Sequence, residues 1–254
     1  MVGNYLVNPS NKLYYLKKED IEKEAEYLAN KYFPECVENC LSIPIDLMIE
    51  KMGINLEFRK LSIHKEILGA CIFKDGTINL FDENNKQFKE IVKANTIVIN
   101  SNLEDDNDIR INFTLGHELG HNVLQGPLYI DYENQVTFFE NDCAISCKRE
   151  YVVPTLTHKQ LVTKLDWMEW QANYFASAIL IPRSSIYKFL QVYIEKYKDV
   201  LGKPILENLS PNEKYGLITI ISEKYNVSFE MAKNRLSNLG LIGDYCEEVV
   251  NIWS

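Results

Sequence analysis

The sequence lacks the features that would place the chain in a membrane or on nucleic acid. No uncharged apolar run approaches the roughly 18 residues that a membrane-spanning helix needs, and the first ten residues show no basic segment followed by an apolar one. Basic residues are fewer than acidic ones: the chain has 27 Lys and Arg and 36 Asp and Glu, which gives a net charge of −9. A field of that sign repels phosphate. We therefore expect a cytoplasmic protein with no direct nucleic-acid or membrane partner.

Histidine and cysteine are also scarce, with four and six residues in a chain of 254. Six cysteines could form three disulfides, but a chain of this length can bury a core without them, so we expect reduced thiols. The hydrophobic share of 46% and the charged share of 25% are those of an ordinary globular protein. The length allows one large domain or one domain with an appendage.

Strand patterns come early in the chain. The spacing predicts a surface helix over 20–32 and a short helix from Pro44 to Gly53. Strands are expected over residues 54–58, 67–73, 77–81 and 95–100. Asp75 and Gly76 have the composition of a two-residue hairpin turn between the second and third of these strands. Without βαβ alternation, this order predicts an α+β fold with a small, mostly antiparallel sheet packed on a helix pair.

Helix patterns fill most of the second half. Buried helices are expected over 109–126 and 166–181, and amphipathic ones over 184–197, 211–224 (opened by a capping box at Ser210) and 229–238. Residues 126–165 show no clear periodicity and are interpreted as a loop-rich insertion in which 129–139 could form a hairpin. We divide the chain into a main domain over 1–205 and a helical C-terminal subdomain over 206–254.

His117-Glu118-Leu119-Gly120-His121 is the most informative motif. Residues four apart lie on one face of a helix, so the imidazoles of His117 and His121 can reach one metal ion. Glu118 is displaced around the helix axis, where it can act on a water molecule beside that ion. The alternative, two histidines satisfied by backbone carbonyls, is disfavoured because the motif has the helical context that it requires.

A catalytic zinc site needs a third protein ligand, and the second buried helix offers Glu169. Asn173 shares its face and could orient the Nδ1 of a ligand histidine. The alternative role of Glu169 is as the partner of Asp166 in a capping box.

Small residues predict close packing of these two helices. Gly116 and Gly120 flank the histidine face, and each costs about 1 kcal/mol of helix stability unless something packs against it. Ala172 and Ala176 are the residues that we expect there.

Three blocks of the chain resemble the ImmA/IrrE family of metallopeptidases over roughly residues 40–242. They are Phe113-Thr-Leu-Gly-His-Glu-Leu-Gly-His121, Glu169-Trp-Gln-Ala-Asn-Tyr-Phe-Ala176 with Leu180-Ile-Pro182, and Val227-Ser-x-x-x-Ala232-x-x-Arg235-Leu-x-x-Leu-Gly-Leu241. The resemblance implies a zincin-type peptidase in which His117, His121 and Glu169 bind Zn²⁺ and Glu118 is the catalytic base. The segment between His121 and Glu169 is longer than is usual in the family.

The family includes proteases that cleave repressors of mobile elements and of stress responses. The resemblance therefore implies hydrolysis of a specific protein, such as a transcriptional repressor or a similar regulatory partner. The alternative is a non-proteolytic regulator that keeps a zincin-like fold and binds a repressor or antitoxin, since a complete ligand set does not guarantee access for a polypeptide.

Other residues suggest weaker sites. Cys36 with Cys40, and Cys143 with Cys147, could hold a second zinc, but inert thiols fit their spacing better. His158, Tyr151 or Tyr174 could stabilise an oxyanion. The helices on either side of Asn226 resemble a helix-turn-helix with Lys233 and Arg235 on the second helix, for which a packing role is the alternative.

Two segments could hold a substrate. Residues 95–100 could be an exposed sheet edge that pairs with substrate backbone, or an interior strand. The insertion over 126–165 is long enough to act as a lid or as a wall of the site.

Overall fold

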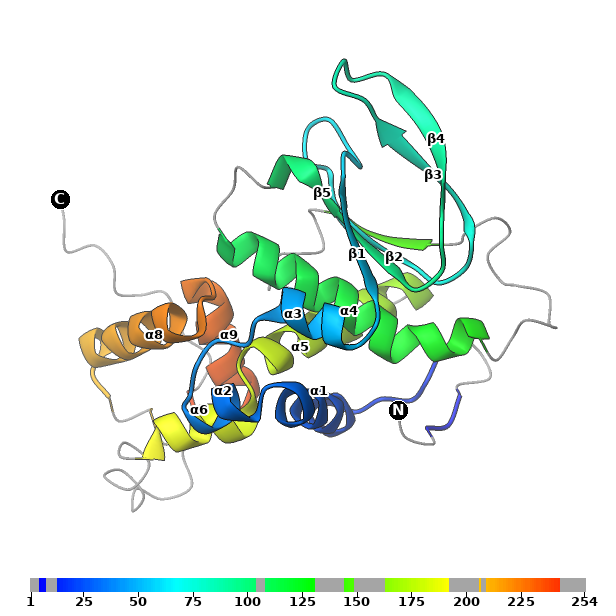
Figure 1. Cartoon of the computed structure of the whole chain (residues 1–254). Coiled ribbons are helices and arrows are strands. Elements are labelled where there is room, and N and C mark those ends of the chain that lie inside the picture. The colour runs from blue at the N-terminus through cyan, green and yellow to red at the C-terminus, as the bar shows by residue number, and fades with distance from the viewer. Residues whose placement is uncertain are drawn as a thin grey trace.

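The computed structural model describes residues 5–7, 13–103, 108–130, 144–148, 163–191, 206 and 209–242 (Figure 1). Its helices are α1 (Lys18–Tyr32), α2 (Pro34–Glu38), α3 (Ile45–Lys51), a 3-10 turn (Ser101–Leu103), α4 (Asp108–Ile130), α5 (Lys164–Leu180), α6 (Arg183–Phe189), α8 (Pro211–Tyr225) and α9 (Phe229–Asn238). Its strands are β1 (Asn55–Arg59), β2 (Ile67–Ile72), β3 (Gly76–Phe81), β4 (Gln87–Val92), β5 (Thr96–Asn100) and β6 (Ala144–Lys148). None of the described helices is long and apolar enough to cross a bilayer.

A small mixed sheet packs against helices, so the predicted α+β class is confirmed. The strand order is β1-β5-β2-β6, with β1 parallel to β5 and the other pairs antiparallel. Strands β3 and β4 form a separate antiparallel ribbon. The helix α4 lies along one face of the sheet, and α5 and α1 follow behind it (Figure 1). Side chains of the other face, such as Ala70 and Val98, pack with Leu80 and Val92 of the ribbon.

The hairpin predicted at Asp75 and Gly76 is wrong. Strand β2 pairs with β5 and β6, and β3 pairs with β4. Strand β2 is buried along nearly its whole length and so requires a partner at each edge, and neither turn residue has a positive φ. The true hairpin turn follows β3, where Asn85 has a φ of 61° and the Asp82 carboxylate accepts backbone N–H groups. Asp75 instead accepts the N–H of Ala94 at 2.8 Å.

The interpretation of residues 95–100 as an exposed sheet edge is also wrong. Strand β5 lies between β1 and β2, and every one of its residues is buried. Its run of β-branched residues is therefore that of an interior strand, which is the alternative stated above. No backbone group of β5 is left for a substrate to pair with in this sheet.

The helix ends show how local capping sets the boundaries. The prediction that α4 ends at Gly126 is wrong, because the helix continues through Pro127 to Ile130. Thr163 is the N-cap of α5, and its hydroxyl accepts the N–H of Asp166 at 3.1 Å. The predicted helix over 184–197 and the hairpin considered for 129–139 both extend beyond the described residues, within which α6 covers Arg183–Phe189 and residues 129–130 belong to α4. The capping box at Ser210 is confirmed.

One cluster of buried hydrophobic side chains runs from Leu13 to Ile242 and includes residues of α1, α4, α5, α8 and α9. Inside it, the fully buried guanidinium of Arg235 on α9 donates to both carboxylate oxygens of Glu22 on α1. The hydroxyl of Tyr174 on α5 donates to the same carboxylate at 2.8 Å, and Arg235 Nε donates to the carbonyl of Ile181 at 3.0 Å. Arg235 thus joins three helices and cannot contact DNA. The division at residue 206 stays a prediction.

Replacement of Arg235 by Met is expected to lower the free energy of unfolding by about 3–5 kcal/mol, because Glu22 would remain as a buried, unpaired charge. Burial raises the pKa of Glu22, but the contacts with Arg235 outweigh it and hold that pKa below its usual 4.5. A carboxyl with a lowered pKa stabilises the fold at pH values above its unfolded pKa, and this stabilisation is lost as the pH falls. The difference in unfolding free energy between the wild type and Arg235→Met should therefore become smaller below pH 4.5. Urea unfolding at several pH values measures this difference.

The control is Glu230→Gln on the same helix, whose side chain is 46% exposed and whose carboxylate lies 3.7 Å from the Lys233 amine. It should change the free energy of unfolding by less than about 1 kcal/mol. Equal losses in the two variants would contradict a special role for the buried pair.

Candidate metal centre

Two helices approach each other closely at their small residues. A Cβ added to Gly120 of α4 would lie 3.1 Å from the Cα of Ala172 on α5, and one added to Gly116 would lie 3.4 Å from the Cα of Ala176. The expected packing of these alanines against these glycines is therefore confirmed. It brings the histidine face of α4 against the Glu169 face of α5.

The side chains of His117, His121 and Glu169 converge across this contact. Their ligand atoms all lie within 4.8 Å of one another, and all three residues are fully buried. The Nε2 of His117 lies 3.2 Å from one Glu169 oxygen, and the Nε2 of His121 lies 3.5 Å from the other. Among the described residues, these three form the group of His, Cys, Asp and Glu side chains that could hold a metal ion.

The chemistry of this group fits a divalent cation. Both carboxylate oxygens of Glu169 are buried and accept no hydrogen bond of good geometry from the described residues. A buried carboxylate in that state is costly unless a cation compensates it. Two imidazoles and a carboxylate are a donor set that zinc accepts, and three protein ligands leave a position open.

The protonation states also suit metal binding. Burial lowers the pKa of His117 below its usual 6.5, although Glu169 opposes this shift. Burial alone would raise the pKa of Glu169, but its contacts with His117 and His121 outweigh burial and lower it to about 2. At neutral pH the ligands are a neutral imidazole and an ionised carboxylate, which are the forms that bind metals.

Each histidine is also held on its outer side. The Nδ1 of His117 lies 2.9 Å from Oδ1 of Asn173, so the contact expected for Asn173 is present. The Nδ1 of His121 lies 3.0 Å from Oε1 of Gln125, whose Nε2 donates to Gln171 at 2.8 Å. Sequence reasoning missed both glutamines. The signal for Gln125 was its spacing of four residues from His121, which places it on the same helix face.

Glu118 lies on another side of α4, against the central strand β2. It is fully buried, and a Cβ added to Gly69 of β2 would lie 2.6 Å from its Oε1. Cys71, two residues along the strand, is fully buried too; burial, and then the charge of Glu118, raise its pKa well above the usual value. The carboxylate of Glu118 therefore occupies a space that only a glycine at position 69 leaves open.

Asp166 occupies the third position of α5, with Thr163 as the N-cap. The capping role considered for Glu169 is therefore wrong, because Asp166 is not the N-cap that it would require.

The described residues do not form the weaker candidate sites. The Cys40 thiol donates to the carbonyl of Ser185, and the two cysteines at 36 and 40 join no metal-binding group among the described residues. Tyr174 does not face the metal group, since its hydroxyl donates to Glu22. Tyr151, Cys143 and His158, and the side chain of Cys147, lie outside the described residues.

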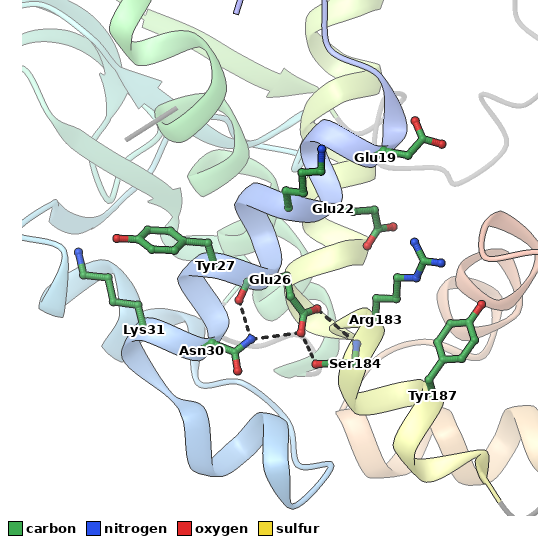
Figure 2. A pocket seen from close by; sticks show the side chains of 10 residues that line it. Glu19, Glu22, Glu26, Tyr27, Asn30, Lys31, Arg183, Ser184 and Tyr187 are labelled. Atoms are coloured by element: carbon green, nitrogen blue, oxygen red, sulfur yellow. Dashed lines mark hydrogen bonds between the residues drawn. The ribbon is translucent and has the colours of Figure 1, made fainter. Parts of the chain in front are cut away.

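A separate groove of about 950 Å³ lies between α1 and α6. Figure 2 shows its wall, where Glu26 accepts hydrogen bonds from Asn30 and Ser184, and Arg183 lies near Tyr187. The three metal-group residues do not line this groove. The groove is therefore distinct from the candidate metal centre.

A comparison with known families finds that residues 163–237 match the family model Peptidase_M78, described as the IrrE N-terminal-like domain. The matched range contains Glu169 and Asn173 on α5 and extends through α8 to α9, whereas the two histidines lie before it on α4. No curated protein matched the chain.

Substitution of a ligand is expected to remove a bound metal. Purified wild-type protein should hold about one divalent ion per chain, whereas His117→Ala and Glu169→Ala should each hold far less, because two remaining ligands bind zinc weakly. Elemental analysis of the purified proteins measures this ratio. His64→Ala is the control, since that histidine is exposed. Retention of the metal in both ligand variants would show that the ion binds elsewhere.

Proposed function

We propose that this chain, a member of the ImmA/IrrE metallopeptidase family, is a zinc-dependent endopeptidase that hydrolyses a peptide bond in a specific regulatory protein, such as a transcriptional repressor. One observation carries the proposal. The ligand atoms of His117, His121 and Glu169 converge in a buried group, and Glu169 lies within the part of the chain that matches the family.

Zinc is the metal that we assign to this group. Two imidazoles and one carboxylate suit its preference for nitrogen and oxygen ligands, and a set of three protein ligands is typical of catalytic sites. When bound, zinc polarises a carbonyl oxygen as a Lewis acid and lowers the pKa of water toward about 7.

Glu118 is the general base in this proposal. Its carboxylate is buried beside the ligand helix face, next to His117 in sequence, and Gly69 gives it room against β2. It takes a proton from the attacking water and returns it to the nitrogen of the leaving amine. Asn173 orients the ring of His117 by accepting its Nδ1–H, so that Nε2 faces the ion.

The substrate backbone needs a place other than the interior strand β5. Strand β6 comes from the insertion over 126–165 and is the outermost described strand on the side of β2. Gly69 of β2, which adjoins the Glu118 carboxylate, pairs with Cys147 of β6, so an extended peptide on the outer edge of β6 would lie two strand spacings, about 10 Å, from Gly69. We place the substrate there.

Co-incubation with repressor-type proteins encoded by neighbouring genes tests the activity itself. Defined fragments are expected by mass spectrometry, and a chelator should abolish them, because the ligand group would be empty. A stable, intact complex with and without the chelator would instead support the non-proteolytic regulator.

Replacement of Glu118 by Gln tests the mechanism. The variant should keep its metal but lose at least about 10²-fold in kcat/KM on the substrate identified above, because the amide cannot accept the proton. Glu50→Gln, on the exposed surface of α3, is the matched control and should keep full activity. Gly69→Ala should lower turnover in the same direction, since its Cβ would displace the Glu118 carboxylate. Unchanged turnover of Glu118→Gln would contradict this mechanism.

A further inference from the structure

The outer nitrogen of His121 is connected to a buried chain of two amides. Its Nδ1 lies 3.0 Å from Gln125 Oε1, and Gln125 Nε2 donates to Gln171 Oε1 at 2.8 Å. We propose that Gln125, aligned by Gln171, is a positioning residue that holds His121 as a metal ligand with its Nε2 free. This inference rests on the metal centre of the proposed function and extends it beyond the ligands.

The direction of these hydrogen bonds follows from the groups on either side of the two amides. At one end, Nε2 of His121 belongs to the converging ligand group and must carry no proton to bind an ion, so the ring proton belongs on Nδ1 and points at the Gln125 oxygen. At the other end, Nε2 of Gln171 points at the backbone carbonyl of Tyr14 at 3.5 Å, a group that only accepts. Both ends therefore favour the same orientation of the two amides.

Burial makes the hydrogen bonds of these two amides important for metal binding. Gln125 is fully buried and Gln171 is 4% exposed, so water does not compete for either amide. A buried N–H on His121 without an acceptor would cost free energy in the geometry that binds metal, and the ring could then rotate or change tautomer. Loss of such an outer contact typically weakens metal binding by roughly 10–100-fold.

The two ligand histidines are supported differently. His117 is held by Asn173 across the interface from α5, whereas His121 is held by Gln125 of its own helix. Gln125 is joined to α5 by its hydrogen bond to Gln171. Gln171 therefore acts on His121 through Gln125, by fixing which end of the Gln125 amide faces the ring.

Zinc affinity measured by competition with a chromophoric chelator tests the proposal without using catalysis. Gln125→Leu should weaken zinc binding by roughly 10–100-fold, because it removes the acceptor. Gln125→Glu keeps an acceptor oxygen, and a charged one, so it should bind zinc at least as tightly as the wild type. Gln171→Leu should weaken binding less than Gln125→Leu, and the double variant should match Gln125→Leu.

Two further measurements separate positioning from simple stability. Nitrogen-15 NMR of the zinc-loaded wild type should show His121 protonated at Nδ1. Leu124→Ala, a change at a fully buried neighbour whose apolar side chain can form no hydrogen bond to the ring, should lower the unfolding temperature but leave zinc affinity unchanged. A folded Gln125→Leu protein with wild-type affinity, or equal weakening by the Leu and Glu variants, would overturn the inference.

The same data distinguish this inference from the function on which it rests. A wild-type protein that binds no zinc would overturn the metal centre and with it the role of Gln125. Zinc binding with the predicted order of affinities but no cleavage of any partner would overturn only the peptidase activity.

Discussion

The close contact between α4 and α5 is the constraint on which the candidate site depends. The glycines of α4 at positions 116 and 120 bring its backbone within reach of Ala172 and Ala176. Each glycine weakens the isolated helix by about 1 kcal/mol, and only packing against the partner helix can offset this. Even a methyl group at position 120 would lie 3.1 Å from the Ala172 backbone and press the helices apart, whereas at position 116, where a Cβ would lie 3.4 Å from Ala176, only a bulkier side chain would do so. Glu169 would then move away from the two histidines, so the convergence of these three side chains depends on the tight interface.

Local patterns in the sequence were enough to predict that His117, His121 and Glu169 lie together, but not to predict how the strands pair. The four-residue spacing of His117 and His121 and the shared face of Glu169 and Asn173 are properties of single helices, so they could be read directly. Strand pairing is a long-range property. Asp75 and Gly76 have turn composition, yet burial of β2 decided its partners. Gln125 had the signal of its four-residue spacing from His121, but Gln171 had none, because the partner of a buried amide is known only once its neighbours are placed.

The buried ion pair extends the influence of the C-terminal helices toward the site. Arg235 on α9 and Tyr174 on α5 both donate to the Glu22 carboxylate of α1. Glu169 lies on the same α5, so α1 and α9 hold in place the helix that brings Glu169 to the candidate metal centre. A buried pair of this kind is weak support for stability compared with apolar packing, but it fixes the relative positions of the helices that it joins.

Because Gly69 has no side chain, the role proposed for Glu118 depends on the register of β2 with its neighbouring strands. Successive residues of a strand alternate between faces, so a one-residue slip of β2 would present Ala70 to α4 in place of Gly69. Its methyl group would occupy the volume of the Glu118 carboxylate. A mispaired sheet could still bury apolar side chains and still leave the three metal ligands on their helices. Such a protein would be folded and metal-loaded but inert, and its fault would lie in the alignment of hydrogen bonds between β2 and its neighbours.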